Sequence, residues 1–451
     1  MKLRAMFAKT IAKFSYWILK TFTDGGSSFP GKVAMKLDPN ILSELAKNYR
    51  VVIITGTNGK TVTTALITQI LNQKFANTIT NSTGSNMLQG IVSTFVNAKV
   101  GTKHSDQNLA ILEVDEASLR RITKFIKPEL ILVTNIFRDQ LDRYGEIYTT
   151  YQYILEGARQ APEAKLILNG DLPLLHSEET KNPQIYYGFA NQQKTTLKDA
   201  PHNTDGIICP QCEQILSYYM LTYSNLGDYH CAHCGFSRPP LTYQVDGIND
   251  LTPDSSTFTI AGEEFYLLVA GLYNIYNALA AYAVALEFSM DPQTIRQGLA
   301  ATKRVFGRQE VIQTQGKEVH LNLIKNPVGC NQIIELLKLE QRPFSLLVFL
   351  NSQPADGRDI SWIWDADFEA IQAISSCQQI TVGGERQEDM KKRLEVAGLA
   401  NKNLQTLDAE VVDAIHNNQE QTIYILTTYT ALLEIREQLA KAGIIKERMQ
   451  A

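Results

Sequence analysis

Short apolar runs alternate with amphipathic stretches along most of this chain. Aliphatic and β-branched residues fill the runs 51–54, 109–112, 130–133 and 166–168, and polar residues follow each run. Continuous apolar runs of this length are typical of strands buried on both faces of a parallel sheet. We therefore predict an α/β domain in which strands and helices alternate from residue 50 to about residue 300.

The same pattern returns in the last third of the chain. Apolar runs at 345–350, 379–382 and 422–426 are separated by sequence with helical spacing. We predict a smaller, Rossmann-like, doubly wound α/β domain here. The expected division is 1–48 for an N-terminal helix and lead-in, 49–309 for the central domain and 310–451 for the C-terminal domain.

The first twenty residues have a different pattern. Large apolar side chains stand at helical spacing, with Lys and Arg between them: Leu3, Phe7, Ile11, Phe14 and Ile18. Such a basic amphipathic helix either lies on an anionic membrane surface or packs against the adjacent domain, and the pattern leaves both open.

Length, charge and hydropathy limit the class of protein. A chain of 451 residues is long enough for about three domains. A net charge of -4 gives no overall basic footprint, so no nucleic-acid partner is expected. The first residues lack the continuous apolar core of a secretory signal, and no run reaches the roughly 18 apolar residues that span a bilayer. The expected location is the cytoplasm, with a peripheral position at the inner face of the membrane if the N-terminal helix binds lipid.

The strand that begins at Val51 leads into a glycine-containing turn and then a helix. The turn has the residues of a phosphate-binding loop, namely Gly56, Thr57, Asn58, Gly59, Lys60 and Thr61. Glycines let backbone N–H groups approach an anion, and the helix N-terminus adds the positive end of its dipole. Lys60 supplies a point charge and Thr61 a hydroxyl ligand for Mg²⁺. The strict pattern requires glycine at Ile54, so this loop is shortened; a glycine-rich turn without a ligand is the alternative.

Carboxylates follow the next predicted buried strand. The run 109–112 ends at Glu113, with Asp115 and Glu116 close behind. Carboxylates at the C-terminal end of a strand beside a phosphate loop are well placed to hold Mg²⁺. We predict that Glu113 and Thr61 bind the ion. Whether Asp115 or Glu116 joins them stays open, and a solvated acidic turn is the alternative.

Four of the six cysteines form two closely spaced pairs. Cys209 and Cys212 are separated from Cys231 and Cys234 by eighteen residues. Two thiolates from each of two turns complete a tetrahedron around Zn²⁺ and leave no position open for catalysis. We predict a structural zinc ribbon in an insertion of the central domain at about 195–245.

The shortened loop from Thr55 to Thr61 resembles that of the Mur ligases and folylpolyglutamate synthases. These enzymes convert a carboxylate into an acyl phosphate with ATP and let an amine displace the phosphate. Further segments resemble Mur ligase motifs in the same order: Thr134–Ile136, Asn169–Asp171, Gly271–Asn277 and Gly307–Arg308. The resemblance implies that Asn274 and Asn277 face the nucleotide. It also implies that Arg308 reaches the γ-phosphate, where a guanidinium stabilises charge on the transferring phosphoryl group.

Three positions depart from the usual Mur ligase pattern. Gln140 stands where the family usually has a metal-binding His, which puts a second Mg²⁺ in doubt. Ile154 lies near the place of the lysine that many members carbamoylate. Tyr273 replaces the His of the Gly-x-His-Asn motif. These departures weigh against an ordinary ligase that adds an amino acid.

The C-terminal third narrows the resemblance. Lys325–Pro327, the cysteine insertion and the segment Ala355–Asp365 together resemble the Mur-ligase-like subunits of lipid II isoglutaminyl synthases, over essentially the whole chain. That family works as a heterodimer with a GatD-type glutaminase, which has a catalytic Cys and His but lacks the acidic member of the triad. The resemblance implies that an Asp of this chain completes the triad. Asp356 is the first choice, Asp359 the second and Asp365 a distant third, with a turn or helix cap as the alternative.

The resemblance implies ATP-dependent amidation of the α-carboxylate of D-isoglutamate in the lipid II stem peptide. Lys60 and Arg308 would stabilise charge on the phosphoryl group, and the glutaminase would supply ammonia. Cys330 and Cys377 lack the strand-to-helix elbow of a glutaminase nucleophile, so the partner is required when glutamine is the nitrogen source. Two alternatives stay open. One is a ligase that adds an amino acid, and the other is a zinc-ribbon scaffold in which the nucleotide is only regulatory.

Overall fold

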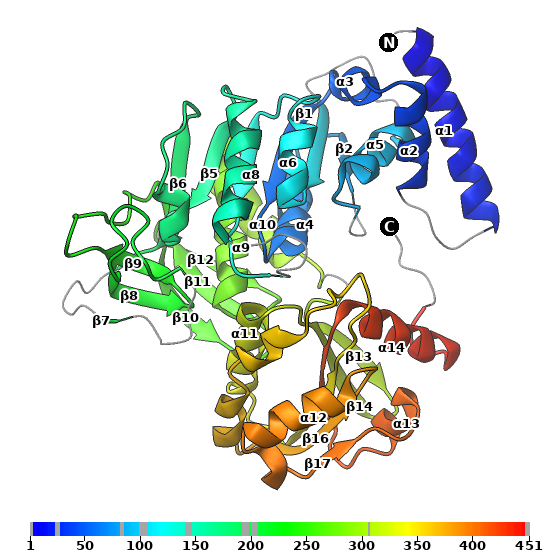
Figure 1. The fold of residues 1–451 in the computed structure, drawn as a ribbon, viewed down its shortest axis with the longest axis vertical. Helices are drawn as coiled ribbons and strands as arrows, with labels where there is room; N and C mark the ends of the chain where they lie inside the picture. The colour runs from blue at the N-terminus through cyan, green and yellow to red at the C-terminus, as the bar shows by residue number, and fades with distance from the viewer. Residues whose placement is uncertain are drawn as a thin grey trace.

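The structure is a computed structural model that describes residues 3–22, 28–81, 85–98, 107–139, 147–191, 198–199, 206–304 and 307–446. Two α/β sheets lie one above the other, with a three-stranded sheet at one side of the upper one (Figure 1). The α/β prediction is therefore confirmed. In the part of the chain that the structure describes, no helix has the length and apolar character needed to cross a membrane.

The upper sheet has nine strands in the order β12-β11-β10-β6-β5-β4-β1-β3-β2. Their bounds are β1 (Arg50–Thr55), β2 (Asn77–Thr80), β3 (Asn108–Glu113), β4 (Leu130–Val133), β5 (Lys165–Asn169), β6 (Gln184–Phe189), β10 (Tyr243–Leu251), β11 (Ser256–Ile260) and β12 (Glu263–Leu267). β1 pairs in parallel with β3 on one side and β4 on the other. The register Ile54↔Glu113 therefore brings the polar end of β3 beside the start of the phosphate loop.

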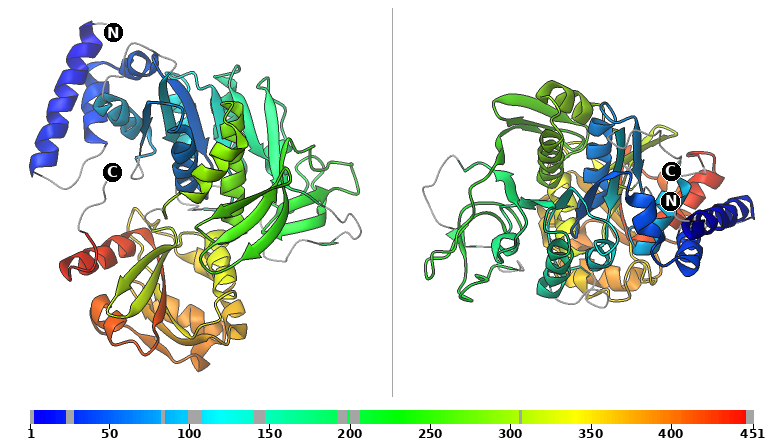
Figure 2. Two further views of the ribbon diagram at one scale, coloured as in Figure 1. Left: turned by 180° about the vertical axis from the view of Figure 1, so that it is seen from behind. Right: turned by 90° about the horizontal axis from the view of Figure 1, so that it is seen from above.

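Helices cover both faces of this sheet (Figures 1 and 2). α6 (Glu116–Ile122) packs on α8 (Ile147–Arg159), and α4 (Lys60–Leu71) packs on α9 (Leu272–Glu287) and α10 (Pro292–Ala300). A short 3₁₀ helix, η2 (Pro173–His176), follows β5. The middle strands are mostly apolar because both of their faces are buried; every residue of β3 and β4 is buried, including the polar ends of β3, Asn108 and Glu113.

The N-terminal helices lie at the outer edge of the upper sheet (Figures 1 and 2). α1 (Leu3–Phe22), α2 (Phe29–Leu37) and α3 (Ile41–Ala46) precede β1 along the chain, and α5 (Leu88–Asn97) joins them in space. α2 packs closely on α5: a Cβ at Gly31 would overlap the backbone carbonyl of Gln89. The side chains of residues 18–22 lie outside the description.

The three-stranded sheet lies between β6 and β10 along the chain. It consists of β7 (Lys198–Asp199), β8 (Ser217–Tyr223) and β9 (Leu226–His230), all antiparallel. Its core is small, with two cysteines and four other side chains buried together: Cys209, Cys231, Leu216, Tyr218, Tyr229 and Phe236. A core of this size is too small to fold by itself without a further constraint such as a metal.

The lower sheet has six strands in the order β13-β14-β18-β15-β16-β17, of which only β13 is antiparallel to its neighbour. The strands are β13 (Glu310–Thr314), β14 (Lys317–Leu323), β15 (Phe344–Phe349), β16 (Cys377–Gly383), β17 (Leu404–Thr406) and β18 (Thr422–Thr427). The helices are α11 (Pro327–Leu337), η3 (Ser361–Trp364), η4 (Phe368–Ala373), α12 (Gln387–Val396), η5 (Leu399–Asn401), α13 (Val411–His416) and α14 (Tyr429–Lys441).

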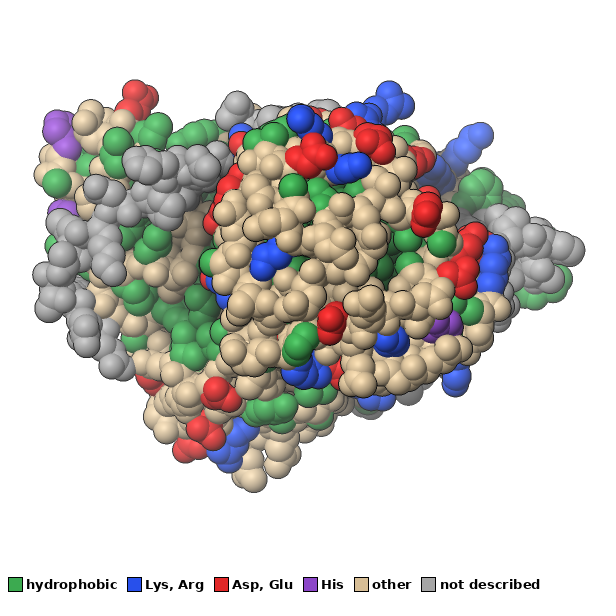
Figure 3. All heavy atoms as spheres, turned by 90° about the horizontal axis from the view of Figure 1, so that it is seen from below, with side chains coloured by type: hydrophobic (Ala, Val, Ile, Leu, Met, Phe, Trp, Pro, Cys, Tyr) green, Lys and Arg blue, Asp and Glu red, His purple; other side chains and the backbone are tan. Residues whose placement is uncertain are grey.

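Alternate residues of the central strand β15 enter separate cores. Leu346 and Val348 pack with α11 and α12, whereas Leu347 and Phe349 pack with α13 and α14. This division follows from the two-residue period of a strand. Viewed from below, this unit shows acidic and basic side chains interspersed (Figure 3).

Candidate functional site

The phosphate loop is braced by the polar end of β4. The backbone N–H of Thr57 donates to the carbonyl of Asn135 (2.9 Å), and that of Asn58 donates to Asn135 Oδ1 (2.9 Å). Gly56 has φ 126° and Gly59 has φ 87°, conformations that favour glycine. A Cβ at Gly59 would overlap the side-chain oxygen of Asn277, so α9 also lies directly against the loop. Sequence reasoning placed Asn135 in a family segment and missed this bracing role.

Lys60 is folded into the loop. Its Nζ donates to the carbonyl of Gly56 and forms a 3.1 Å ion pair with Glu116 Oε1, and both side chains are buried. Burial alone would lower the pKa of Lys60, but Glu116, Glu113 and Asp115 raise it. The nearby carboxylates therefore favour the charged form of Lys60, whereas burial raises the pKa of Glu116 and Lys60 acts to lower it. The structure brings an ammonium group to the place where the loop would hold an anion, and pairs it with a carboxylate.

The three carboxylates after β3 have different surroundings. Asp115 caps α6 and accepts from the N–H of Ser118 (3.2 Å), while Glu116 pairs with Lys60. Glu113 is also buried, and its backbone is held by Asn81, which accepts from its N–H and donates to its carbonyl. In the described ranges no hydrogen bond to the Glu113 carboxylate is found. Of the three carboxylates, Glu113 has the one least committed to protein contacts, as a metal ligand requires.

Arg308 lies within electrostatic reach of Glu113. Burial lowers the pKa of this guanidinium, and Glu113 acts in the opposite direction. The neighbouring Gln309 donates to the hydroxyl of Tyr273 (2.6 Å), which stands at the start of α9. Glu113 therefore lies within electrostatic reach of both Lys60 and the half-buried Arg308, although the three residues lie far apart in the sequence.

Asn274 and Asn277 occupy the first turns of α9. Asn277 Nδ2 donates to Asn274 Oδ1 (3.1 Å), and Asn274 Nδ2 donates to the carbonyl of Ala270 (2.8 Å). Both amides are buried. Here the pair fixes the start of α9 against Gly59; contact of Asn274 with nucleotide stays a prediction.

The two α/β units meet at the phosphate loop. Asn58 and Asn326 exchange side-chain hydrogen bonds of 3.3 and 3.1 Å, and Lys325 donates to Asp139 Oδ2 (2.6 Å). Asn326 also caps α11, accepting from the N–H of Gly329 (2.8 Å). The segment Lys325–Pro327 thus contacts the loop itself. Gln140, the residue next to Asp139, lies outside the described residues, so the predicted effect on a second Mg²⁺ stays open.

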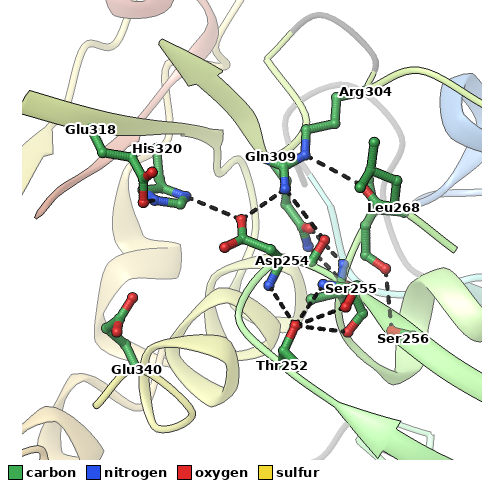
Figure 4. Close-up of polar contacts among 12 residues, drawn as sticks. Thr252, Asp254, Ser255, Ser256, Leu268, Arg304, Gln309, Glu318, His320 and Glu340 are labelled. Atoms are coloured by element: carbon green, nitrogen blue, oxygen red, sulfur yellow. Dashed lines mark hydrogen bonds and ion pairs between the residues drawn. The ribbon is translucent and has the colours of Figure 1, made fainter. Parts of the chain in front are cut away.

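A second junction joins the units on another side (Figure 4). Arg304 donates to Asp254 Oδ1 (2.7 Å), and His320 lies between Asp254 (3.8 Å) and Glu318 (2.9 Å). The ring of His320 is buried and stacks on Tyr424 at 4.4 Å between centroids. Asp254 comes from the β10–β11 turn, whereas His320 and Glu318 belong to β14, so charges from both units meet here.

The candidate triad aspartates lie in the loop after β15. Asp356 is buried; its carboxylate accepts from the N–H (2.7 Å) and hydroxyl (2.5 Å) of Thr430 and from the N–H of Gln353 (3.1 Å). Asp359 is half-buried, and a hydrogen bond from the Ser361 N–H (2.8 Å) lowers its pKa. Asp365 forms an ion pair with Arg138 of the upper unit. Asp356 is thus the most rigidly held of the three and Asp359 is less committed.

The four paired cysteines converge as predicted. The distances Cys209 Sγ–Cys234 Sγ and Cys212 Sγ–Cys231 Sγ are 3.6 and 3.5 Å, and all four sulfurs lie within 4.8 Å of one another. A tetrahedral Zn²⁺ with bonds of about 2.3 Å needs sulfurs about 3.8 Å apart. Backbone hydrogen bonds lower the pKa of Cys231 to about 6, whereas burial raises the pKa of Cys209, so the fit to a metal rests on the positions of the four sulfurs. The donor set fits a structural zinc ion.

A buried polar network ties the cysteine unit to α9. Arg238 donates to Asp171 Oδ1 (2.7 Å) and lies 3.3 Å from Asp228 of β9. Asp171, which is completely buried after β5, also accepts from the hydroxyl of Tyr276 (2.6 Å), and that hydroxyl lies 2.8 Å from Thr222 of β8. Sequence reasoning identified Asp171 as part of a family segment but missed this role.

Two family profiles match the chain. The family described as "MurT ligase C-terminal" matches residues 323–432, and the "Mur ligase middle domain" matches residues 54–220. A subunit of Streptococcus pneumoniae named "Lipid II isoglutaminyl synthase (glutamine-hydrolyzing) subunit MurT" is 47% identical over 451 residues, 100% of each chain. A Staphylococcus aureus protein of the same name is 32% identical over 446 residues, covering 98% of this chain and 99% of that one.

Solved structures agree on the fold. A pseudomurein peptide ligase type C from Methanothermus fervidus superposes with a TM-score of 0.64 at 22% identity, over 87% of this chain and 79% of that one. MurF from Thermotoga maritima, solved in complex with ADP, gives a TM-score of 0.60 at 16% identity, over 91% of this chain and 85% of that one. The fold is therefore that of the Mur ligases.

Proposed function

The chain belongs to the MurT family of Mur-ligase-like enzyme subunits, and from this premise we propose that it is the synthetase subunit of a lipid II isoglutaminyl synthase. In this reaction, part of peptidoglycan synthesis, the α-carboxylate of D-isoglutamate in the stem peptide becomes an amide. The two relatives named above are called lipid II isoglutaminyl synthase subunits. Their similarity extends over 100% and 98% of this chain. We also propose the domain division at residues 49 and 310 and a cytoplasmic site of action, at the inner face of the membrane where a lipid-linked substrate is presented.

The buried site around the phosphate loop supplies the binding chemistry. Thr57 to Thr61 and the start of α4 hold the phosphates of ATP, and Thr61 and Glu113 hold Mg²⁺. MgATP supplies the phosphoryl group that activates the substrate carboxylate. Lys60 and Arg308, both within electrostatic reach of Glu113, stabilise the negative charge that spreads over that group. Asn274 positions the nucleotide from α9.

The observation that carries this proposal is the convergence of Lys60, Glu113, Glu116 and Arg308 at a loop that also contacts Asn326 of the second unit. Binding of phosphates would draw Lys60 from Glu116 toward the anion. Since Asn58 is hydrogen-bonded to Asn326, a movement of the loop would act directly on the unit that carries Asp356.

Ammonia comes from a GatD-type glutaminase in a heterodimer, and Asp356 of this chain completes its triad. A triad acid orients the imidazole of the base and stabilises its cation. Support comes from the three hydrogen bonds that fix the Asp356 carboxylate and from its place beyond the carboxyl end of β15. Asp359 is the alternative because its carboxylate is more accessible. The zinc ribbon, with Zn²⁺ on Cys209, Cys212, Cys231 and Cys234, is structural in this proposal.

The test is amidation of lipid II by the chain together with the glutaminase, with ammonium or glutamine as nitrogen source. Two quantities are measured: the rate of ATP hydrolysis and the mass of the stem peptide. We expect ATP-dependent amidation with both sources, and with ammonium alone when the glutaminase is left out. Amidation with neither source overturns the proposal. Incorporation of a free amino acid without the glutaminase establishes the amino-acid ligase instead. ATP binding without turnover in any mixture favours the scaffold.

Ile154 bears on the choice between amidation with ammonia and addition of an amino acid. Ile154 is buried in the core face of α8, so no lysine is available there for carbamoylation. This observation favours ammonia over an amino acid as the attacking nucleophile.

A further inference from the structure

Up to residue 17, the first helix turns small side chains inward and several large apolar ones outward. Ala5, Ala8 and Ala12 are completely buried, and α1 packs through them on α2 and α5. Five large apolar side chains are exposed, by 86% at Leu3, 51% at Met6, 63% at Phe7, 60% at Phe14 and 59% at Trp17. A helix that served only to pack on this domain would place its largest apolar residues inward.

Leu3, Phe7, Thr10, Phe14 and Trp17 form one continuous stripe, which we call the outer face of α1, and the exposed Met6 lies beside it. Positions 3, 7, 10, 14 and 17 follow one another at intervals of three or four residues, so they share one side of the helix. Phe14 and Trp17 stack at 5.8 Å between ring centroids. Thr10, the polar member of the stripe, donates its hydroxyl to the carbonyl of Met6 (3.0 Å), so it brings no unsatisfied donor to an apolar environment.

Basic residues border the outer face, and acidic residues are absent from the helix sequence. Lys9 and Lys13 flank the stripe on one side, and Arg4 lies on the other, where it donates to the carbonyl of Leu37 (2.9 Å). The chain as a whole has a net charge of -4. Its first 48 residues are nevertheless basic, with Lys2, Arg4, Lys9, Lys13, Lys20, Lys32, Lys36 and Lys47 against Asp24, Asp38 and Glu44.

The shape of this region favours a lipid surface over a protein groove. α1 forms the outermost ridge of the molecule in both side views (Figures 1 and 2). A convex apolar ridge bordered by cations matches the interface of an anionic bilayer, into which an amphipathic helix sinks by about 5–10 Å. Aromatic side chains such as Trp17 are well suited to the boundary between headgroups and acyl chains.

We propose that the outer face of α1 docks on an anionic membrane surface and holds the phosphate-loop site near a lipid-linked substrate. The closeness to a lipid-linked substrate rests on the proposed function, whereas the docking itself rests on the exposed apolar and basic residues of α1. Lys9 and Lys13 contribute the electrostatic attraction, and Phe7, Phe14 and Trp17 contribute the apolar insertion.

The test is flotation of the full chain with its glutaminase on vesicles of phosphatidylglycerol and phosphatidylcholine, compared with phosphatidylcholine alone. We expect binding that requires the anionic lipid and weakens with salt. The double substitution F7E/F14E should lower the partition coefficient at least about tenfold, and K9E/K13E should lower it less while removing the salt dependence. Val396→Glu is the matched control, because Val396 is as exposed as Trp17, at 59%, but lies on α12.

Amidation kinetics on two substrates distinguish failure of the docking proposal from failure of the proposed function. With lipid II in vesicles, F7E/F14E should raise the apparent KM several-fold, whereas kcat on a water-soluble stem-peptide substrate stays unchanged. An unchanged melting temperature shows that the variant folds. Wild-type protein that ignores anionic vesicles overturns the docking proposal. So does a variant that changes the oligomeric state or loses the glutaminase, since the outer face would then bind protein. Failure of amidation on both substrates, with vesicle binding intact, overturns only the proposed function.

Discussion

The two α/β units place polar groups at the same edge of their sheets but hold them differently. Beyond β1 and β3, charged groups of the phosphate-loop site influence one another: Lys60 forms an ion pair with Glu116, and Arg308 lies within electrostatic reach of Glu113. Beyond β15, the carboxylate of Asp356 is held by three donors that come mainly from Thr430. Both edges are where open α/β sheets place function.

The difference indicates different kinds of chemistry. Pairs of opposite charge can exchange partners when phosphates and Mg²⁺ arrive, so the first site is arranged to reorganise around a ligand. A carboxylate fixed by several hydrogen bonds keeps its position, which suits a group that orients another protein's side chain. Changes at the phosphate-loop site should therefore lower amidation with both ammonium and glutamine. Changes at Asp356 should lower only amidation with glutamine.

Replacement of Lys60 should have the largest effect. Lys60→Met removes the cation from the loop, and we expect loss of amidation with both ammonium and glutamine by about 10³-fold. The single variant also leaves Glu116 buried without its partner, at a cost of about 3–5 kcal/mol in stability. The double variant K60M/E116Q should regain the melting temperature but not the activity, and Lys124→Met on the surface should change neither. Activity in K60M/E116Q would contradict the role of Lys60.

Asp356→Asn should separate the two reactions. We expect glutamine-dependent amidation to fall by about 10²-fold or more while ammonium-dependent amidation is retained, measured with the glutaminase present. Thr430→Val controls for packing, because it removes a donor to Asp356 and keeps the carboxylate. If Asp356→Asn retains both reactions and Asp359→Asn loses the glutamine-dependent one, Asp359 is the triad member.

Loss of the zinc site should weaken only the first of the two sites. Cys231→Ser should abolish bound zinc, measured by elemental analysis, and lower the melting temperature of the chain because the small ribbon core depends on the metal. Through Arg238, Asp171 and Tyr276 the ribbon supports α9, so we expect both amidation reactions to fall together by a few-fold. Cys377→Ser is the control, since this buried cysteine lies in the lower unit. A change in the ratio of ammonium-dependent to glutamine-dependent amidation would contradict an effect transmitted from the ribbon to α9.

The sequence predicted the buried strands and the cluster of four cysteines, and the structure shows how these parts of the chain meet. Apolar runs predicted the buried strands because burial on both faces leaves a continuous pattern, and the spacing of Cys209 to Cys234 predicted a closed metal site. The pairing of Lys60 with Glu116 could not be predicted, because the sequence does not show which of Glu113, Asp115 and Glu116 ends the strand, caps the next helix or turns toward the loop. Contacts between units, such as Asn58 with Asn326, depend on how two domains dock, and no local pattern encodes that.

Glu318 at the second junction should give the smallest effect, and one that depends on pH. Burial alone would raise the pKa of Glu318, but hydrogen bonds from His320, Gln313 and Arg342 lower it to about 2. A carboxyl group with a lowered pKa stabilises the fold above its unfolded pKa of about 4.3, and this contribution is lost as the pH falls toward 2. Glu318→Gln should therefore cost about 1–2 kcal/mol at pH 7, after allowance for partial exposure.

Chemical unfolding at pH 7, 5, 4 and 3 measures this difference between wild type and Glu318→Gln. The gap should stay constant from pH 7 to 5 and narrow progressively below about pH 4.3. Glu335→Gln is the matched control, because Glu335 pairs with Lys338 on an exposed helical turn and should cost little at any pH. A gap that is the same at pH 3 as at pH 7 would mean that Glu318 contributes through packing instead of charge. The hydrogen bonds that Glu318 accepts from Gln313 and His320 would then add no pH-dependent stability to the lower unit.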